Sequence, residues 1–156
     1  MQQRLDASLK KPGLDAKLRL YVYRFFVDRG RAPLVAEMAK GLSSSVRDAK
    51  AALERLSQTH AFVLQENGEL WRAAPFSAVP TAFPVKIGRK SWYGNCIWDA
   101  LGIPAMLHDD ARVLASCGCC NFEMVLNVRD GRLLPREGLG HFAVPASQWY
   151  QDIVFT

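Results

Sequence analysis

The amino-acid sequence predicts an α+β fold. A winged-helix-like bundle of three helices with a hairpin precedes a small mixed or antiparallel sheet that carries one further helix. Apolar residues recur at helical spacing in the N-terminal part and fall in short, strand-like runs in the C-terminal part. The dipeptide Asn67-Gly68 between two apolar runs is a strong hairpin signal. We therefore expect a loose arm at 1–13, a winged helix-turn-helix-like domain at 14–78 and an α+β domain at 79–156.

Glycine and proline residues divide the N-terminal part into three helical segments. The first is expected over 14–28 and the second over 34–42, because apolar residues there lie on one helical face. The serines at 43–45 are N-cap candidates for a third helix that reaches Leu56. The strand, turn and strand that follow complete the order of a winged helix-turn-helix, whose third helix can enter the major groove of DNA.

The positive charge of the chain lies in its N-terminal part. Residues 1–60 contain 12 Lys and Arg against 6 Asp and Glu, a net charge of +6, whereas residues 61–156 contain 8 against 9, a net charge of −1. Such asymmetry fits either a DNA-binding half or a solvated helical surface. The third helix mixes bases with acids: Arg47, Lys50 and Arg55 with Asp48 and Glu54. We therefore favour a helical platform packed against the second half over a DNA-binding face.

Composition points to a cytoplasmic protein without a membrane partner. The chain has 156 residues, of which 49% are hydrophobic, so it can bury a core. It has no apolar run as long as a membrane span, and its first residues are polar and charged. In such a chain, the four cysteines are more readily explained as metal-binding, catalytic or buried thiols than as a disulfide framework.

The C-terminal part begins with a proline-punctuated connector at 73–90, in which one strand is expected at 83–87. A helix is then expected from Asn95 and should end or kink at Pro104, because proline disfavours the helical conformation of the residue before it. Further strands are expected at three places: 111–117, 122–128 and 141–144.

Cys96 and Asp99 form the first candidate site. If Asn95 caps the helix, Cys96 lies in the first turn, where free N–H groups and the helix dipole stabilise a thiolate. Asp99 projects from the same face and could take a proton from the thiol or pass one to a substrate. The simpler alternative is a small buried cysteine beside a first-turn carboxylate. Trp92 and Trp98 flank the pair, and core packing is the commoner role of such aromatic residues.

The remaining cysteines, Cys117, Cys119 and Cys120, lie just downstream. They resemble neither half of a zinc ribbon, and the adjacent pair is awkward for one tetrahedral ion even if Cys96 completes a four-sulfur site. Strand alternation places Cys117 on the apolar face, which favours a structural role. Cys119 and Cys120 follow the strand, and we expect them to be more accessible.

These segments resemble the organomercurial (alkylmercury) lyase family. The resemblance covers roughly residues 15–156 and rests on three stretches: Tyr93 to Ala105, Ala111 to Cys117, and His141 to Pro145. In the family, a winged-helix-like part also precedes the catalytic part. The resemblance therefore implies that residues 79–156 form a lyase-like catalytic domain.

Members of this family split a carbon–mercury bond with two cysteines and an aspartate. The resemblance implies that Cys96 is the mercury-binding thiolate, that Asp99 handles the proton delivered to carbon, and that Cys117 is structural. The second catalytic cysteine of the family follows the segment that matches residues 141–155, and this chain does not contain it. Three alternatives follow: the chain is truncated, Cys119 or Cys120 substitutes and binds mercury together with Cys96, or the protein has lost the reaction.

The implied function is release of a hydrocarbon and thiol-bound Hg(II) from a small organomercurial, without a required cofactor. Cellular thiols or a mercury-accepting reductase would take the product. A different class of function also fits the sequence: a thiol-based metal-binding or metal-sensing protein with a DNA-binding winged helix and no catalysis. A family relative that uses the fold for another ligand is a third hypothesis.

Overall fold

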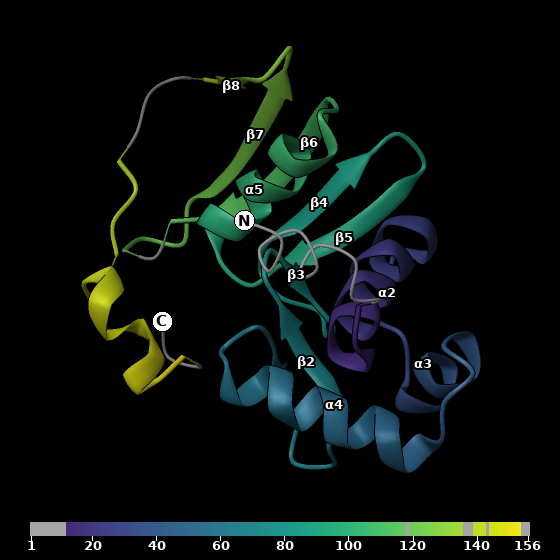
Figure 1. Ribbon diagram of the computed structural model, residues 1–156. Coiled ribbons are helices and arrows are strands. Elements are labelled where there is room, and N and C mark those ends of the chain that lie inside the picture. The colour runs from purple at the N-terminus through teal and green to yellow at the C-terminus, as the bar shows by residue number, and fades with distance from the viewer. Residues whose placement is uncertain (1–11, 118, 136–138, 143, 154–156) are drawn as a thin grey trace, which may run out of the picture. The chain divides into compact units, whose positions relative to one another are not determined.

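The computed structural model describes residues 12–117, 119–135, 139–142 and 144–153, and it divides into two units between Ala73 and Ala74 (Figure 1). Most of the expected N-terminal arm lies outside the described residues. The division falls earlier in the chain than the expected boundary at 78/79. The reason is that β3 (Phe76–Ser77) pairs with β5 (Lys90–Gly94) and so belongs to the second unit.

The first unit contains, in its described residues, the expected helices and hairpin. Its elements are α2 (Leu14–Arg29), α3 (Val35–Gly41), α4 (Val46–Gln58), β1 (Val63–Leu64) and β2 (Leu70–Ala73). Helix α2 ends at Gly30, whose φ of 71° is the left-handed conformation that glycine adopts without strain. Helix α4 begins after Ser45, whose side-chain oxygen accepts a hydrogen bond of 3.0 Å from the amide of Asp48.

Buried apolar side chains from all three helices form the core of this unit. They include Leu18, Val22 and Phe26 of α2, Met38 of α3, and Ala52 and Leu53 of α4. The periodic apolar pattern in the sequence therefore corresponds to faces that the helices bury against one another.

Two ion pairs stabilise the ends of these helices. Arg31 donates two hydrogen bonds, of 2.8 and 2.7 Å, to the carboxylate of Glu37, which also accepts the amide of Leu34 at 2.9 Å. Arg31 and this backbone amide lower the pKa of Glu37 to about 2. On α4, Arg55 forms a two-bond ion pair with Asp15 at the start of α2.

The second unit is an antiparallel sheet with one long helix among the described residues. The remaining strands are β4 (Pro84–Ile87), β6 (Ala111–Ser116), β7 (Glu123–Arg129) and β8 (Arg132–Leu134). Within the unit the strand order is β3-β5-β4-β6-β7-β8, and every pairing is antiparallel. Helix α5 (Ile97–Leu107) contacts β3, β4, β5 and β6 and thus covers one face of the sheet (Figure 1).

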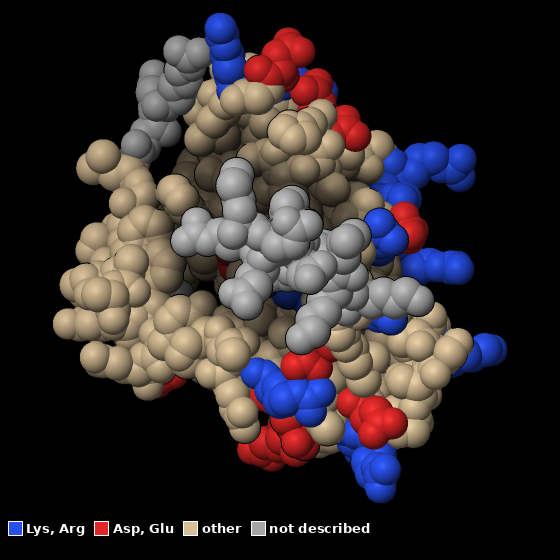
Figure 2. Space-filling view, viewed as in Figure 1, with Lys and Arg blue, Asp and Glu red and all other residues tan. Residues whose placement is uncertain are grey.

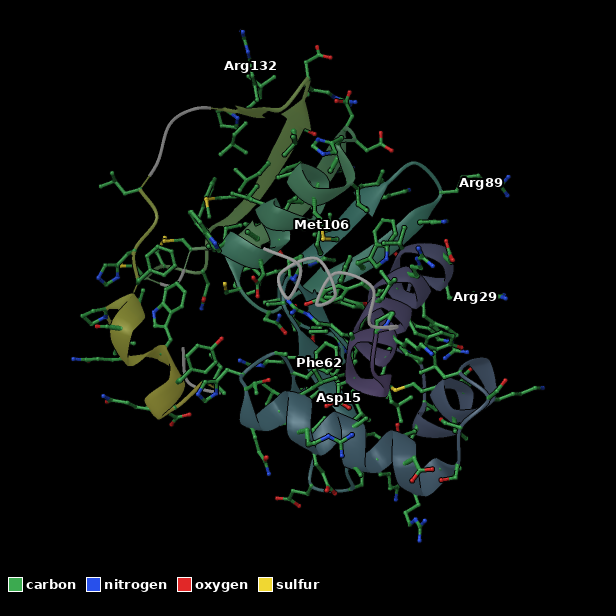
Figure 3. The ribbon with its side chains drawn as sticks, in the orientation of Figure 1. Asp15, Arg29, Phe62, Arg89, Met106 and Arg132 are labelled. Atoms are coloured by element: carbon green, nitrogen blue, oxygen red, sulfur yellow. The ribbon has the colours of Figure 1, made fainter. Side chains whose placement is uncertain are left out.

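The α+β class predicted from the sequence is therefore confirmed. Side chains alternate along β6, where Ala111, Val113 and Ala115 are buried and the residues between them are exposed. Arg89, in the turn between β4 and β5, and Arg132, at the start of β8, point away from the ribbon (Figure 3). None of the helices in the described residues is long and apolar enough to cross a bilayer.

Helix α5 differs from its prediction at both ends. Its N-cap is Cys96, one residue later than the expected Asn95, and the helix continues through Pro104 to Leu107. Proline removes one helical hydrogen bond, yet the helix continues past Pro104, and both Ile103 and Pro104 are buried. The helix ends instead at His108, which adopts a left-handed conformation with φ of 53°.

The strand predicted at 141–144 is wrong. His141, Phe142 and Val144 are not part of a strand, and a 3₁₀ helix, η1 (Ala146–Gln151), follows them; position 143 lies outside the described residues. The indole nitrogen of Trp149 donates a hydrogen bond of 3.0 Å to the carbonyl of Val144, which turns the chain back on itself. Conversely, the short strands β3, β5 and β8 were not anticipated.

Candidate active site

The connection between β5 and α5 is tight because Gly94 has no side chain. A Cβ atom built there would lie 2.5 Å from the amide nitrogen of Ala100 and 2.7 Å from its Cα. The backbone of Gly94 is fixed as well: its amide donates to the carbonyl of Phe83 at 3.0 Å, and its carbonyl accepts the hydroxyl of Thr81 at 2.6 Å. The strand end is therefore held directly against the first turn of the helix.

Cys96 occupies the N-cap of α5 in an extended conformation, with φ of −145° and ψ of −178°. Its carbonyl accepts the amide of Ala100 at 2.9 Å, and its side chain is half-buried. The N-terminal N–H groups and the dipole of a helix favour an anion at this end. Although the cap is one residue later than predicted, Cys96 still lies where the helix stabilises a thiolate.

Asp99 lies one turn further along, and Asn95 fixes its carboxylate. The side-chain nitrogen of Asn95 donates a hydrogen bond of 2.8 Å to Oδ2 of Asp99 and a longer one of 3.4 Å to the carbonyl of Phe76. Oδ1 of Asn95 is buried and has no hydrogen-bond partner among the described residues. Asn95 is therefore not the helix cap but the residue that orients Asp99.

Strand topology brings the two cysteine segments to one edge of the sheet. Strands β5 and β6 both pair antiparallel with β4, so they run in the same direction, and Val85 of β4 pairs with Trp92 on one side and Val113 on the other. The C-terminal ends of β5 and β6 therefore share an edge, with backbones roughly 10 Å apart at two inter-strand spacings. Cys96 follows β5 at this edge, and Cys117 follows β6.

Cys117 is half-exposed, and its sulfur accepts three hydrogen bonds. The donors are the backbone amide of Cys119, the backbone amide of Cys120 and the thiol of Cys120, and they lower the pKa of Cys117 against the opposing effect of desolvation. The side chains of Cys119 and Cys120 are exposed, and none of the four cysteines forms a disulfide. Across the described residues, no three His, Cys, Asp or Glu side chains are grouped to hold a metal ion.

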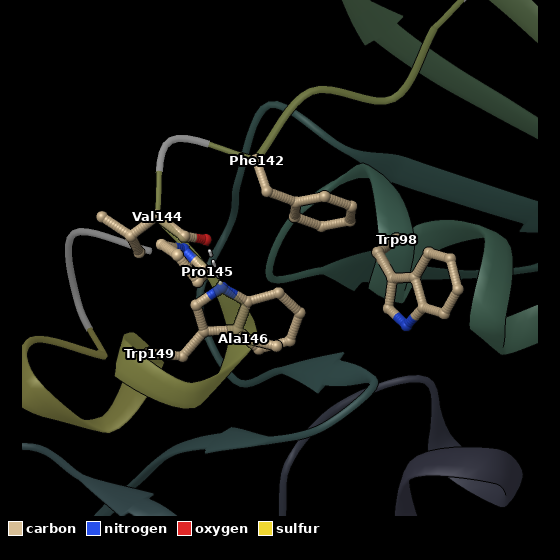
Figure 4. Close-up of a pocket in the computed structure, with 6 residues that line it drawn as sticks. All are labelled: Trp98, Phe142, Val144, Pro145, Ala146 and Trp149. Carbon is tan, nitrogen blue, oxygen red and sulfur yellow. Dashed lines mark hydrogen bonds between the residues drawn. The ribbon is translucent and has the colours of Figure 1, made fainter.

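An aromatic pocket lies beside the first turn of α5. Phe142 stands between Trp98 and Trp149, with ring centroids 6.1 Å and 5.4 Å away, and Val144, Pro145 and Ala146 complete a cavity of about 450 Å³ (Figure 4). Trp98 is 63% exposed, so it is not the core residue that the sequence predicted, whereas Trp92 is buried as expected. The segment 139–153 carries no Lys or Arg, and Asp152 is its one acidic residue, so the left of Figure 2 is almost entirely tan.

A sequence model of the alkylmercury lyase family, MerB, matches residues 76–155, just over half of the chain. The chain belongs to the alkylmercury lyase family. The matched segment contains Cys96, Asp99, the loop from Cys117 to Cys120 and the aromatic pocket.

A solved structure described as the mercury-bound form of MerB2 has the same fold, with a TM-score of 0.64 and 18% sequence identity. The similarity covers 80% of this chain and 60% of that one, so this chain spans about three-fifths of the length of its structural relative. No curated protein matches the sequence.

Within this alkylmercury lyase fold, the sequence placed Cys96 and Asp99 together at the start of a helix, as the structure does, but did not predict what surrounds them. The hydrogen bond from Asn95 to Asp99 was missed because Asn95 has the side chain of a helix cap and was assigned that role. The pocket was missed because Phe142 was assigned to a strand and Trp149 was given no role. The one signal in the sequence was that both positions are aromatic, like Trp98. Nothing in the sequence shows that they line the same pocket as Trp98.

In the N-terminal unit, two of the three basic residues of α4 lie close to acids. Arg55 binds Asp15, and Arg47 lies 3.9 Å from Asp48. Each pair reduces the positive potential that α4 could present to phosphates. A DNA-binding role for this alkylmercury lyase relative stays a prediction, and so does the winged-helix description.

Proposed function

We propose that this protein is an organomercurial lyase-like enzyme, which cleaves a carbon–mercury bond by protonolysis and yields a hydrocarbon and thiol-bound Hg(II). The observation that carries the proposal is the placement of Cys96 at the N-cap of α5 and of Asp99 in its first turn, where Asn95 donates a hydrogen bond of 2.8 Å to the carboxylate. Membership of the alkylmercury lyase family supports it. A thiol captures the soft metal, and a carboxylate one turn away carries the proton.

The reaction balances with these two groups and one further thiol. Asp99 accepts the thiol proton of Cys96, and the thiolate binds the mercury of R–Hg–X, displacing X⁻. The carboxylic acid of Asp99 then protonates the carbon, so that the carbon–mercury bond breaks and its electron pair forms the new C–H bond of R–H. A second thiolate takes the coordination position that the carbon leaves.

Two sources can supply the second thiolate. Cys119 and Cys120 are exposed and lie in the loop that leaves the same sheet edge as Cys96. A small cellular thiol is the other source, and it or a mercury-accepting reductase would carry the Hg(II) away. No cofactor enters the balance. The chemistry requires reduced cysteines, which fits the cytoplasm.

The aromatic pocket is the proposed site for the organic group of the substrate. Trp98 forms one wall of the pocket and belongs to the same helical turn as Asp99, and we place the organic group of mercury bound at Cys96 against this wall. Uncharged aromatic walls bind an aryl or alkyl group by excluding water from both surfaces.

The test is release of benzene from phenylmercury by the purified protein with excess small thiol, measured by gas chromatography. Asp99→Asn and Cys96→Ser should each reduce the rate by roughly 100-fold or more, as expected when a proton-transfer group or nucleophile is lost. Asp109→Asn is the matched control, because Asp109 is exposed and follows the opposite end of α5. Absence of benzene, or full activity in Asp99→Asn, would refute the proposal. Mercury binding without benzene would favour a non-catalytic metal-binding role.

A further inference from the structure

The loop between β6 and β7 is closed by its own backbone. Cys117 donates its amide to the carbonyl of Phe122 at 2.9 Å, and its carbonyl accepts the amide of Asn121 at 2.8 Å. Asn121 adopts the left-handed conformation, with φ of 55°, that asparagine tolerates better than most residues. These contacts hold Cys117 and Cys120 on one turn rather than on a free strand end.

The sulfur of Cys117 is surrounded by donors from that turn. The turn brings the amides of Cys119 and Cys120 and the thiol of Cys120 within hydrogen-bonding reach of the Cys117 sulfur. The same contacts lower the pKa of Cys117 and favour its thiolate. Cys119 contributes its backbone amide, which does not depend on its side chain.

We propose that Cys117 and Cys120 form a two-thiol site that binds one soft, thiophilic ion, Hg(II) above all, independently of Cys96. Thiolates select soft metals. Zinc normally takes four protein ligands in a structural site, and the described residues offer no group of even three. Hg(II) forms stable linear complexes with two thiolates, so a pair of sulfurs is sufficient for it.

Binding involves no oxidation. The thiolate of Cys117 and the thiol of Cys120 each form one S–Hg bond, the S–H bond of Cys120 breaks, and its proton passes to water. The site goes beyond the proposed lyase reaction, because it needs neither a carbon–mercury bond nor Asp99. A failure of the lyase assay therefore does not affect it, and its own test does not measure hydrocarbon release.

The first experiment measures mercury retained by the full chain in a Cys96→Ser background. Hg(II) is supplied as its complex with excess free cysteine, unbound metal is removed by gel filtration, and bound mercury is measured by elemental mass spectrometry. Cys96→Ser and Cys96→Ser/Cys119→Ser should each retain one Hg(II) per chain. Cys96→Ser/Cys120→Ser should bind at least about 100-fold more weakly, a larger effect than the loss of an outer-shell partner.

A second measurement uses the unaltered protein and so does not depend on how the variants fold. Hg(II) should protect Cys117 and Cys120 from iodoacetamide, as read by peptide mass spectrometry, and leave Cys119 reactive. Equal mercury retention in the Cys119 and Cys120 double variants, or protection of Cys119 in place of Cys120, would overturn the proposal.

Discussion

Asn95 holds Asp99: its side-chain nitrogen lies 2.8 Å from Oδ2 of the carboxylate, and the same nitrogen reaches the carbonyl of Phe76 at 3.4 Å. The asparagine thereby links the end of β5, strand β3 and the first turn of α5. A carboxylate that must deliver a proton to a bound carbon needs a fixed direction. This hydrogen bond provides it.

Replacing Asn95 with alanine should therefore reduce kcat of the proposed reaction with little change in KM. A hydrogen bond to a charged group contributes about 1.5 kcal/mol or more, which corresponds to roughly a tenfold lower rate. Steady-state release of benzene from phenylmercury measures both constants. Asn67→Ala is the matched control, since the side-chain oxygen of Asn67 accepts a local hydrogen bond from the backbone amide of Glu69, in the hairpin. An unchanged kcat in Asn95→Ala would show that Asp99 does not depend on this contact.

Substitution by alanine should have opposite effects on stability at Gly94 and at Gly102. A Cβ at position 94 would come within 2.5 Å of the backbone of Ala100, whereas at position 102 the nearest atom, Cβ of Pro75, is at an ordinary 3.5 Å. Gly94→Ala should therefore destabilise the protein by about 1–3 kcal/mol through overpacking. Gly102→Ala, inside α5, should stabilise it by up to about 1 kcal/mol through helix propensity. Urea denaturation measures both, and equal effects would contradict the close packing of β5 on α5.

Local sequence patterns predicted the helices well because each boundary had a local cause. Gly30 ends α2 and Ser45 begins α4, and both residues act on the backbone next to them. The pairing of Cys96 with Asp99 was also predictable, because their spacing alone places them on one helical turn. The end predicted at Pro104 was wrong: α5 continues to Leu107 and packs against strands that lie elsewhere in the sequence, which no local pattern reveals.

The parts that could not be predicted depend on long-range contacts. Strand β5 buries only alternate residues, such as Trp92, and becomes recognisable as a strand through its pairing with β4. The pocket requires Phe142 to contact Trp98, more than forty positions away in the chain. The hydrogen bonds to the sulfur of Cys117 come from backbone amides, which any sequence would supply and which only the loop conformation directs.

The low pKa of Glu37 predicts that the free energy of unfolding falls at acidic pH. Its pKa in the folded protein is lowered to about 2 by Arg31 and the amide of Leu34, from an ordinary value of 4.5. A lowered folded-state pKa means that the stabilisation is complete above the unfolded value and is lost as pH falls from about 4.5 toward 2. Because the pair is solvent-exposed, its contribution at neutral pH is only about 1 kcal/mol.

The variant Glu37→Gln should therefore be less stable than the unaltered protein at neutral pH, and this difference should shrink on acidification through that window. Urea denaturation midpoints at a series of pH values measure it. Glu66→Gln, at an exposed position in the hairpin turn, is the control. A difference that stays constant with pH would show that Glu37 acts through packing rather than through its charge.

Cys117 should react as a thiolate at lower pH than free cysteine. The amides of Cys119 and Cys120 and the thiol of Cys120 lower the pKa of Cys117. Its rate of alkylation by iodoacetamide, followed by peptide mass spectrometry, should rise with a midpoint below the value of about 8.5 for a free thiol. Cys120→Ala removes one of the three donors and should raise the midpoint, whereas Cys119→Ala keeps all three. If both variants shift it equally, the thiol of Cys120 is not a donor.

Trp98 tests whether the aromatic pocket receives the organic group of the substrate. The indole is 63% exposed on α5, so truncation to alanine should cost little stability. Stacking between aromatic rings contributes about 0.5–1.5 kcal/mol beyond area burial. Trp98→Ala should therefore raise KM for phenylmercury by up to roughly tenfold and leave KM for methylmercury nearly unchanged, because a methyl group cannot stack.

Met106 provides the matched control for this substitution. It lies on the same helix, is 41% exposed and does not line the pocket (Figure 3). Met106→Ala should leave KM for both substrates unchanged. If Trp98→Ala raises KM for the two mercurials by the same factor, the indole affects binding of mercury at Cys96 rather than the organic group. The pocket would then be a feature of the fold and not the site that selects aryl substrates.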